Sequence, residues 1–235
     1  MRAALEEAAQ WRADWPRFAG RPEPPAPRFD QDWFPGLDAA LLYGLVRSRR
    51  PRLIIEVGSG HSTRFAAAAM RDAGNVGEIL AIDPAPRAAI ERLEPTVKLH
   101  RKTLQEIGLD LFGALDEGDI LFIDSSHVLM PGSDVDILFN RVMPFLPAGV
   151  LVHVHDILLP DPYPDDWEWR GYNEQNALAG AVAAGGYELL VSSHYAETRM
   201  ASDVAELFAD LPPSPAGARA ASLWMVKRAP AIKRR

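Results

Sequence analysis

The sequence of 235 residues contains no cysteine. This absence excludes disulfides, zinc–thiolate centres, cysteine nucleophiles and thiol redox chemistry together. The sequence also lacks an uncharged apolar run of about 18 residues, so we expect no transmembrane helix. The first 15 residues include three acidic side chains and no continuous apolar stretch, so we do not expect them to form a signal peptide. We therefore expect a cytoplasmic protein.

Positive charge is also scarce, because 25 Lys and Arg residues face 32 Asp and Glu residues, giving a net charge of −7. An acidic surface repels phosphate backbones, so neither nucleic acid nor an anionic membrane is an expected partner. With 48% hydrophobic and 24% charged residues, the chain has enough apolar surface for a folded core. A small molecule is the expected partner.

Short apolar runs alternate with helical patterns after residue 52, which predicts βαβ units and a mostly parallel sheet. Two last strands without a clear long helix between them predict a C-terminal antiparallel hairpin. We expect residues 1–29 to form an N-terminal helix and a proline-rich connector, which are candidates for a homodimer contact, and residues 30–235 to form one domain. The expected strands are Leu53–Val57, Glu78–Ile82, Val97–His100, Asp119–Ile123, Val150–His155, Tyr187–Ser192 and Ala221–Val226; the expected helices are Arg2–Trp15, Leu37–Val46, Thr63–Asp72, Arg87–Leu93, Val135–Phe145 and Glu174–Ala184.

The first expected strand runs directly into Gly58-Ser59-Gly60. Glycines between a strand and a helix allow a tight turn and a close approach of a ligand, although a plain structural turn is the alternative. The next strand ends in Asp83, where an acid can accept both ribose hydroxyls of a nucleoside. The two features together predict a nucleoside-containing cofactor.

The residues around this turn favour S-adenosylmethionine over NAD. A dinucleotide fingerprint has a third glycine where this chain has Thr63, and the carboxylate of Glu56 beside the turn is unfavourable to a diphosphate. The same carboxylate suits a cationic sulfonium and an ammonium group. No nucleotide-triphosphate loop of the G-x-x-x-x-G-K-[ST] type occurs in the sequence.

Several motifs resemble class I methyltransferases, and more narrowly the bacterial family called methyltransferase domain 24. The resemblance covers about residues 30–228 and rests on these segments: Glu56–Thr63, Ile82–Pro84, Ile123–His127, Val154–Asp156, Asp161–Pro164, Tyr172–Gln175 and Ser222–Met225. It implies a Rossmann-like α/β fold with a seven-stranded sheet, helices on both faces, and cofactor at the carboxyl ends of the strands. The cofactor-binding residues it implies are Glu56, Gly58, Ser59, Gly60, Ser62, Asp83, Thr103, Leu104 and Asp124, with Lys102 beside them.

Two further strand ends, at Asp124–His127 and at His155-Asp156, are expected at the same edge of the sheet. A histidine that titrates near neutral pH can remove the proton of a hydroxyl acceptor during methyl transfer. The resemblance assigns this role to His127. For His153, inside an apolar strand, a hydrogen-bonded structural role is the expectation.

The resemblance also implies a metal site, because relatives that methylate sugar hydroxyls bind magnesium through acids at these strand ends. The corresponding residues are Asp124, His155 and Asp156. Since His155 replaces a hard oxygen ligand, the site could hold manganese or another transition metal, retain weakened magnesium binding, or hold no metal.

Residues 157–175 are rich in proline and aromatic side chains and directly follow the fifth strand. Such a segment can cover an acceptor and exclude water, although its aromatics could instead only pack on the body. The acceptor-contact residues expected here are Tyr163, Trp167, Trp169, Arg170, Tyr172 and Glu174.

The sequence thus predicts an S-adenosylmethionine-dependent methyltransferase acting on a small molecule, with a hydroxyl favoured as acceptor. Two alternatives remain at this stage. An NAD-dependent oxidoreductase would bind NADH, and a non-catalytic S-adenosylmethionine-binding protein would bind the cofactor without turnover.

Overall fold

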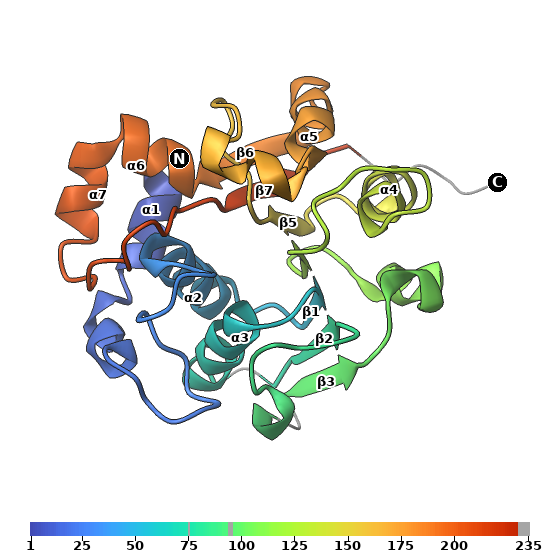
Figure 1. Cartoon of the computed structure of the whole chain (residues 1–235). Coiled ribbons are helices and arrows are strands. Elements are labelled where there is room, and N and C mark those ends of the chain that lie inside the picture. Colours follow the sequence, from blue (N-terminus) through green and yellow to red (C-terminus); the bar gives the residue numbers. More distant parts are fainter. Residues whose placement is uncertain (75, 94–95, 230–235) are drawn as a thin grey trace.

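The computed structural model describes residues 1–74, 76–93 and 96–229. Its centre is a seven-stranded sheet in the order β3-β2-β1-β4-β5-β7-β6, in which β1 to β5 are parallel and β7 runs antiparallel between β5 and β6 (Figure 1). This confirms the expected mostly parallel sheet with a C-terminal antiparallel hairpin. The strands are β1 Leu53–Val57, β2 Glu78–Ile82, β3 Val97–His100, β4 Ile120–Ile123, β5 Leu151–Val154, β6 Tyr187–Ser192 and β7 Leu223–Lys227.

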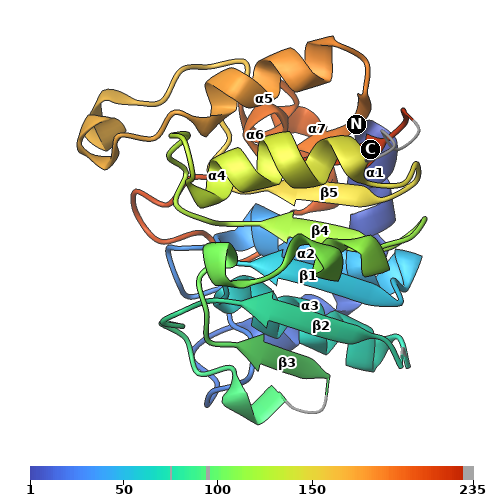
Figure 2. The same ribbon diagram turned by 90° about the vertical axis from the view of Figure 1, so that its right-hand side faces the viewer.

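Helices cover both faces of the sheet (Figures 1 and 2). Along β1, Ile54 packs into the core shared with α1, α2 and α3, whereas Ile55 packs into the core on the opposite face. This alternation follows from the two-residue side-chain period of a strand. The α-helices are α1 Arg2–Ala9, α2 Gly36–Arg49, α3 His61–Asp72, α4 Asp134–Ile137, α5 Glu174–Ala183, α6 Ser193–Arg199 and α7 Ala201–Leu207.

Shorter helical turns connect these elements. They are six 3₁₀ segments, Arg12–Phe18, Glu91–Leu93, Leu104–Glu106, Leu109–Ala114, Met143–Phe145 and Asp165–Arg170, and one π-helical segment, Leu138–Val142. The π segment continues α4, so that the backbone changes its hydrogen-bonding pattern twice between residues 134 and 145.

Three expected helices differ from the observed ones by more than three residues or in type. The N-terminal helix ends at Ala9 rather than Trp15, and a 3₁₀ turn that contains Pro16 follows. Residues 87–93 contain only one 3₁₀ turn, because Pro86 precedes and Pro95 follows too short a segment. The expected helix 135–145 is split as described, with Pro144 in its last turn. Between β6 and β7 lie two short helices, α6 and α7.

The N-terminal helix is packed into the same core as the sheet. Leu5 and Ala8 of α1 are fully buried, and α1 lies against α2. A Cβ atom on Gly44 of α2 would stand 2.4 Å from the Cα of Ala8, so only glycine permits this approach of the two helices.

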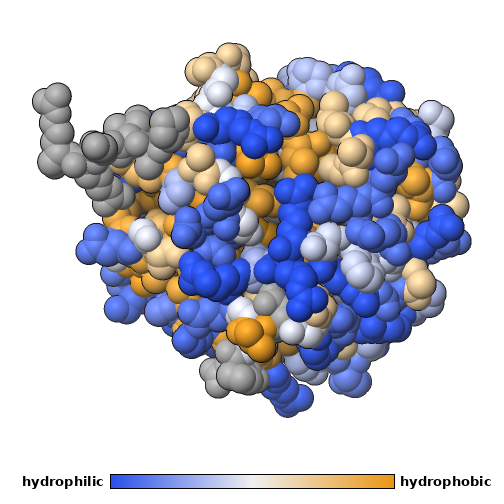
Figure 3. Space-filling view, turned by 180° about the vertical axis from the view of Figure 1, so that it is seen from behind, coloured by the Kyte–Doolittle hydropathy of each residue, from blue (hydrophilic) through white to orange (hydrophobic). Residues whose placement is uncertain are grey.

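The face at the amino ends of the parallel strands is covered largely by hydrophilic residues (Figure 3). Within the described residues, no helix is both long and apolar enough to cross a membrane. The carboxyl ends of β1, β2, β4 and β5 lie at the opposite edge, where the long loops gather (Figure 2).

Candidate active site

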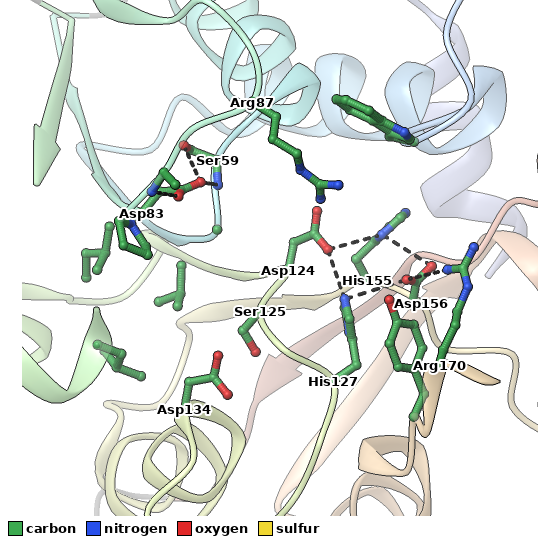
Figure 4. Close-up of a pocket in the computed structure, with 18 of the residues that line it drawn as sticks. Ser59, Asp83, Arg87, Asp124, Ser125, His127, Asp134, His155, Asp156 and Arg170 are labelled. Atoms are coloured by element: carbon green, nitrogen blue, oxygen red, sulfur yellow. Dashed lines mark hydrogen bonds and ion pairs between the residues drawn. The ribbon is translucent and has the colours of Figure 1, made fainter. Parts of the chain in front are cut away.

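A cavity of about 790 Å³ lies at the carboxyl ends of the parallel strands (Figure 4). Ligands of open α/β sheets bind in this position, where the strand order reverses between β1 and β4. Most of the expected site residues line the cavity: Gly58, Ser59, Asp83, Lys102, Thr103, Leu104, Asp124, His127, His155, Asp156, Trp167, Trp169, Arg170 and Tyr172. Glu56, Gly60, Ser62, Tyr163 and Glu174 are not among the lining residues.

Gly58 ends β1 in a conformation that only glycine adopts easily. Its φ is +82°, and a Cβ atom there would stand 1.8 Å from the backbone oxygen of Asp124. The close approach of these two strand ends is fixed by the hydrogen bond of 2.9 Å from the Asp124 amide to the Val57 carbonyl. Gly58 is therefore required by the packing of the protein itself.

Gly60 differs from Gly58, because a Cβ atom at Gly60 would meet no heavy atom within 4 Å and its φ of 176° is extended. Its amide donates a hydrogen bond of 2.9 Å to the Thr63 hydroxyl, which in turn donates to Glu56 at 2.7 Å. Ser62 donates to the other oxygen of Glu56 at 2.6 Å. The Gly60 amide is therefore already hydrogen-bonded within the protein. In a dinucleotide-binding protein, this amide would bind the pyrophosphate.

Glu56 lies behind the wall of the cavity and is almost fully buried. Burial raises its pKa to about 8, although the hydrogen bonds from Ser62 and Thr63 oppose the shift. Burial therefore favours the protonated, neutral form of this carboxyl more than water does. In this structure, Glu56 stabilises the glycine turn through its hydrogen bonds with Ser62 and Thr63.

Asp83, at the end of β2, faces the glycine turn and the cavity. One of its oxygens accepts hydrogen bonds of 2.9 Å from both the amide and the hydroxyl of Ser59, and the other accepts 2.8 Å from the amide of Ala85. The carboxylate is thereby held in one orientation at the cavity wall. An oxygen with two lone pairs retains capacity for a further donor.

His127 is buried and lies among three carboxylates. Its Nδ1 is hydrogen-bonded to Glu174, while its Nε2 lies 3.3 Å from Asp124 and 3.5 Å from Asp156 (Figure 4). Burial by itself would lower the pKa of His127, but Glu174, Asp124 and Asp156 outweigh it and raise the pKa well above the usual value. The imidazole is therefore protonated at neutral pH in this state.

His155 faces the same two carboxylates from β5. Its Nδ1 lies 3.5 Å from Asp124 and 3.6 Å from Asp156, and its Nε2 lies 3.4 Å from Asp38 of α2. Burial opposes protonation, but Asp124 and Asp156 raise the pKa of His155 well above its usual value. The two histidines in turn hold the pKa of Asp124 well below its usual range, against the effect of burial.

Two of these residues have left-handed backbone conformations. The φ of His127 is +59° and that of Asp156 is +55°, which is uncommon for residues other than glycine. The carbonyl of His127 accepts hydrogen bonds from the amides of Asn173 and Glu174, at 3.1 and 3.3 Å. Such backbone strain concentrates at functional sites, where the surrounding structure holds it.

The expected metal ligands lie side by side at the two strand ends, with His155 3.5 Å from Asp124 and 3.6 Å from Asp156. Among residues 1–74, 76–93 and 96–229, no group of three or more His, Asp or Glu side chains is arranged to hold a metal ion. A metal ligand must be a neutral imidazole, whereas Asp124 and Asp156 raise the pKa of His155 and so favour its protonated form. We derive no metal-dependent step from this site.

His153 has no part in the cavity. It is fully buried within β5, stacks on Phe122 with ring centroids 3.8 Å apart, and shares a hydrogen bond of 2.8 Å with Ser222. Burial lowers its pKa well below the usual value, so it is neutral. These contacts are those of a structural histidine.

The aromatic segment 157–175 is partly built into the body. Tyr163, Trp167 and Tyr172 form a small cluster with Leu158 and Ala221, in which Trp167 is only 9% exposed. Trp169, by contrast, is 82% exposed. Arg170 stacks over the Trp167 ring at 4.1 Å and lies 3.7 Å from Asp156.

The structure adds site residues that the sequence reasoning missed. Asp38 is such a residue, since it lies 3.4 Å from His155. Glu174, which was expected among the residues of the segment 157–175 that contact an acceptor, is hydrogen-bonded to His127. Trp33, Arg87, Asp134 and the loop 216–219 also line the cavity. A signal existed for Asp38, because it is the only acid within the apolar run from Leu37 to Val46.

Residues 55–157 match a family model described as a methyltransferase domain. No curated protein sequence matches the chain. A methyltransferase of Podospora anserina bound to S-adenosylhomocysteine is 18% identical, with a TM-score of 0.51 over 96% of this chain and 88% of that one. An O-methyltransferase of Bacillus cereus in complex with the same compound is 13% identical, with a TM-score of 0.50 over 96% and 91%.

The fold is also similar to that of a branched-chain polyamine synthase from Thermus thermophilus, in complex with N4-aminopropylspermidine and 5′-methylthioadenosine. That similarity has 12% identity and a TM-score of 0.51, over 98% of this chain and 66% of that one. At such identities the fold alone does not define the reaction. The match of residues 55–157 to the methyltransferase model confirms the expected resemblance to methyltransferases and the expected class, an S-adenosylmethionine-dependent methyltransferase.

Proposed function

We propose that this protein transfers the methyl group of S-adenosylmethionine to a hydroxyl group of a small molecule, with His127 as the base. The observation that supports the proposal most directly is the setting of His127. Its Nε2 lies at the cavity between Asp124 and Asp156, and its Nδ1 is fixed by the buried Glu174. A carboxylate on one nitrogen orients an imidazole so that the other nitrogen can take a proton.

The residues around the glycine turn fit the methyl donor. Asp83 stands at the cavity wall with its carboxylate already oriented by Ser59, in the position expected for a ribose contact. A Cβ atom at Gly60, beside the lining residue Ser59, would meet no heavy atom of the described residues within 4 Å, which leaves room for a ligand close to the backbone. When bound, S-adenosylmethionine supplies an electrophilic methyl group on a sulfonium.

The raised pKa of His127 sets a condition for its role as base. A protonated imidazole cannot accept the acceptor proton, so His127 must be neutral when the acceptor hydroxyl attacks. A cationic sulfonium in the cavity adjoining Asp124 would oppose a second positive charge on His127 and so lower its pKa. The hydroxyl proton then passes to Nε2, and Glu174 stabilises the imidazolium formed.

NAD is a poorer fit than S-adenosylmethionine. The Gly60 amide, which would bind a pyrophosphate, is already hydrogen-bonded to Thr63. Methyl transfer is also the chemistry of the family whose model matches the chain. We therefore expect no productive NADH binding.

A His127→Ala variant tests the proposal. General-base catalysis contributes roughly 10²- to 10⁴-fold, so transfer from labelled S-adenosylmethionine to a panel of hydroxylated small molecules should fall by that factor. The affinity for S-adenosylhomocysteine should remain within about twofold, because His127 does not adjoin the glycine turn. Unchanged turnover in the variant would contradict the role, and cofactor binding without turnover in the wild type would indicate a binding protein.

A further inference from the structure

A second cavity, of about 590 Å³, lies beside the candidate active site. Asp32, Trp33 and Arg87 line both cavities, so the two adjoin along these side chains. We propose that the second cavity binds an oxyanion, such as a phosphate or carboxylate group of a small molecule. The proposed oxyanion site in the second cavity does not depend on the methyl-transfer reaction.

The charge of this cavity is opposite to that of the protein as a whole. Four guanidinium groups and two carboxylates line it, a net charge of +2, whereas the whole chain has a net charge of −7. His61 adds no charge at neutral pH, because burial, Arg64 and Arg28 lower its pKa to about 4. The charged lining residues are Arg21, Arg28, Arg64, Arg87, Asp30 and Asp32.

The most informative of these residues is Arg64, which is only 4% exposed. Its Nε donates to the Ala89 carbonyl at 3.2 Å, and within the described part of the chain no carboxylate lies at ion-pair distance from it. Burial and the neighbouring Arg28 lower its pKa. A buried guanidinium without a counter-ion is unfavourable, and an anion in the cavity would relieve this.

Two other donors at the cavity have no hydrogen-bond partner among the described residues. They are the buried Nε of Arg28 and the buried Nδ1 of His61. His61 is 7% exposed and is the first residue of the 12-residue helix α3. The amino end of a helix favours negative charge, so the backbone at the start of α3 favours an anion in this cavity, as the arginine side chains do.

Among the described residues, no carboxylate forms an ion pair with Arg28 or Arg64, although the charge of Arg28 acts on Asp30 at longer range. Asp30 is bound to Arg21 at 2.5 Å, and Glu91, which also influences Arg64, is bound to Arg101 at 2.5 Å. Asp32 lines the cavity but is exposed to solvent. An oxyanion is the ligand that would complete the set, because guanidinium groups bind phosphate and carboxylate through charge-assisted hydrogen bonds.

The oxyanion has two potential sources. The side chains shared by the cavities connect them: Arg87 lies over the Trp33 ring at 4.7 Å, and Trp33 lies against His61 with ring centroids 6.0 Å apart. Figure 4 shows the Arg87 side chain extending toward Asp124. An acceptor in the first cavity could therefore reach the second with a pendant anionic group, or a free anion could occupy it.

Calorimetric titration of the full chain with inorganic phosphate and pyrophosphate, at constant ionic strength, tests the site. We expect one binding site in the wild type and affinities lower by about tenfold or more in Arg28→Gln and Arg64→Gln, because each removes a charge-assisted contact. Arg71→Gln is the matched control: it removes an exposed arginine of the same helix, outside both cavities, and should bind as the wild type does. Circular dichroism checks the fold of each variant. If Arg64→Gln does not fold, the comparison of Arg28→Gln with Arg71→Gln is the test.

Titration with glucose 6-phosphate separates the sources. Tighter binding than phosphate, with the gain lost in Trp33→Ala, would assign the site to the pendant group of a larger ligand; equal binding would assign it to a free anion. The proposal is overturned if the wild type binds neither anion, or if Arg28→Gln and Arg64→Gln bind as tightly as Arg71→Gln. The proposal is also overturned if Arg28→Gln weakens the binding of S-adenosylhomocysteine but not that of 5′-methylthioadenosine, which lacks the carboxylate. The oxyanion at this site would then be the carboxylate of the cofactor. Binding of S-adenosylhomocysteine in the same wild-type protein reports separately on the proposed function.

Discussion

Four side chains on two neighbouring strand ends determine the chemistry of the cavity. His127 and His155 face the same two carboxylates, Asp124 and Asp156, and each histidine has a further buried carboxylate on its other nitrogen. The two histidines differ in access. His127 belongs to the loop after β4, whereas His155 is held against α2 by Asp38, so His127 is the better placed to exchange a proton with a ligand.

Replacing Glu174 tests whether this carboxylate raises the pKa of His127. The neutral, base form of His127 predominates only above its pKa, which Glu174 helps to raise. The methyl-transfer rate of the wild type should therefore rise with pH, at pH values above the ordinary histidine pKa of about 6.5. Glu174→Gln removes that negative charge and should move the rising limb to lower pH while reducing the maximal rate. The measurement is the pH profile of kcat for both proteins; a flat wild-type profile, or the same limb in both, would contradict the assignment.

The two glycines of the turn should behave differently. Gly58→Ala places a Cβ 1.8 Å from the Asp124 oxygen at a φ of +82°, so we expect a loss of several kcal/mol of folding free energy, or failure to fold. Gly60→Ala meets open space and should lower the free energy of unfolding by no more than about 1 kcal/mol.

The matched readout is the affinity for S-adenosylhomocysteine, which Gly60→Ala should weaken because its methyl group occupies the space open to a ligand. Thermal unfolding together with calorimetry gives both quantities. If Gly60→Ala bound S-adenosylhomocysteine as the wild type does, the turn would not approach the cofactor at this residue.

Much of the site could be predicted from the sequence because it follows from strand ends. Each apolar strand is followed at once by its polar residue, and parallel strands deliver those residues to one edge. The partners of the histidines could not be predicted in the same way. Glu174 stands 47 residues from His127, and only the packing of α5 against the β4 loop brings them together.

At the scale of elements, helix α2 connects the core to the active site. Asp38, fully buried in α2, accepts hydrogen bonds from the amides of Ala221 and Ser222 at 3.0 and 3.1 Å and also binds Ser193. These bonds hold the start of β7 and the support of His155 in one network. The apolar pattern around Asp38 predicts the helix but not these contacts, because they join three distant segments.

An Asp38→Ala variant should therefore unfold more easily than the wild type. It leaves the buried Ala221 amide without an acceptor, whereas the Ser222 amide still donates to the Ser193 hydroxyl at 2.8 Å. An unsatisfied buried group costs about 1–3 kcal/mol, so we expect a loss on the order of 2 kcal/mol in the free energy of unfolding. Asp38→Asn keeps one acceptor oxygen and should lose less. Urea denaturation measures both, and a stability of Asp38→Ala equal to that of the wild type would show that this network is not required.

Helix boundaries were the weakest predictions at this scale. The strands match within one or two residues. The central strands β1, β4 and β5 are buried along their whole length, which makes them nearly continuous apolar runs. The segment 134–145 has a helical apolar pattern but changes from α to π to 3₁₀ geometry. Periodicity cannot distinguish these three geometries over so few residues.

At the scale of the molecule, the acidic chain concentrates arginines near its two cavities. Arg87, Arg170 and Arg219 line the first cavity, and Arg21, Arg28, Arg64 and Arg87 line the second. A net charge of −7 repels anions at long range, so anionic groups would be drawn only to these local regions. The net charge of the sequence predicts the long-range repulsion of anions. The clustering of the arginines could not be predicted from the net charge, because it depends on the fold.

The central claim is that the cavity at the glycine turn binds S-adenosylmethionine, and calorimetric titration with S-adenosylhomocysteine tests it most directly. We predict one binding site with a Kd on the order of micromolar, no detectable binding of NADH, and an affinity for S-adenosylhomocysteine at least about tenfold weaker in Asp83→Ala. Absence of S-adenosylhomocysteine binding by the folded wild-type protein, or binding of NADH in its place, would contradict the account.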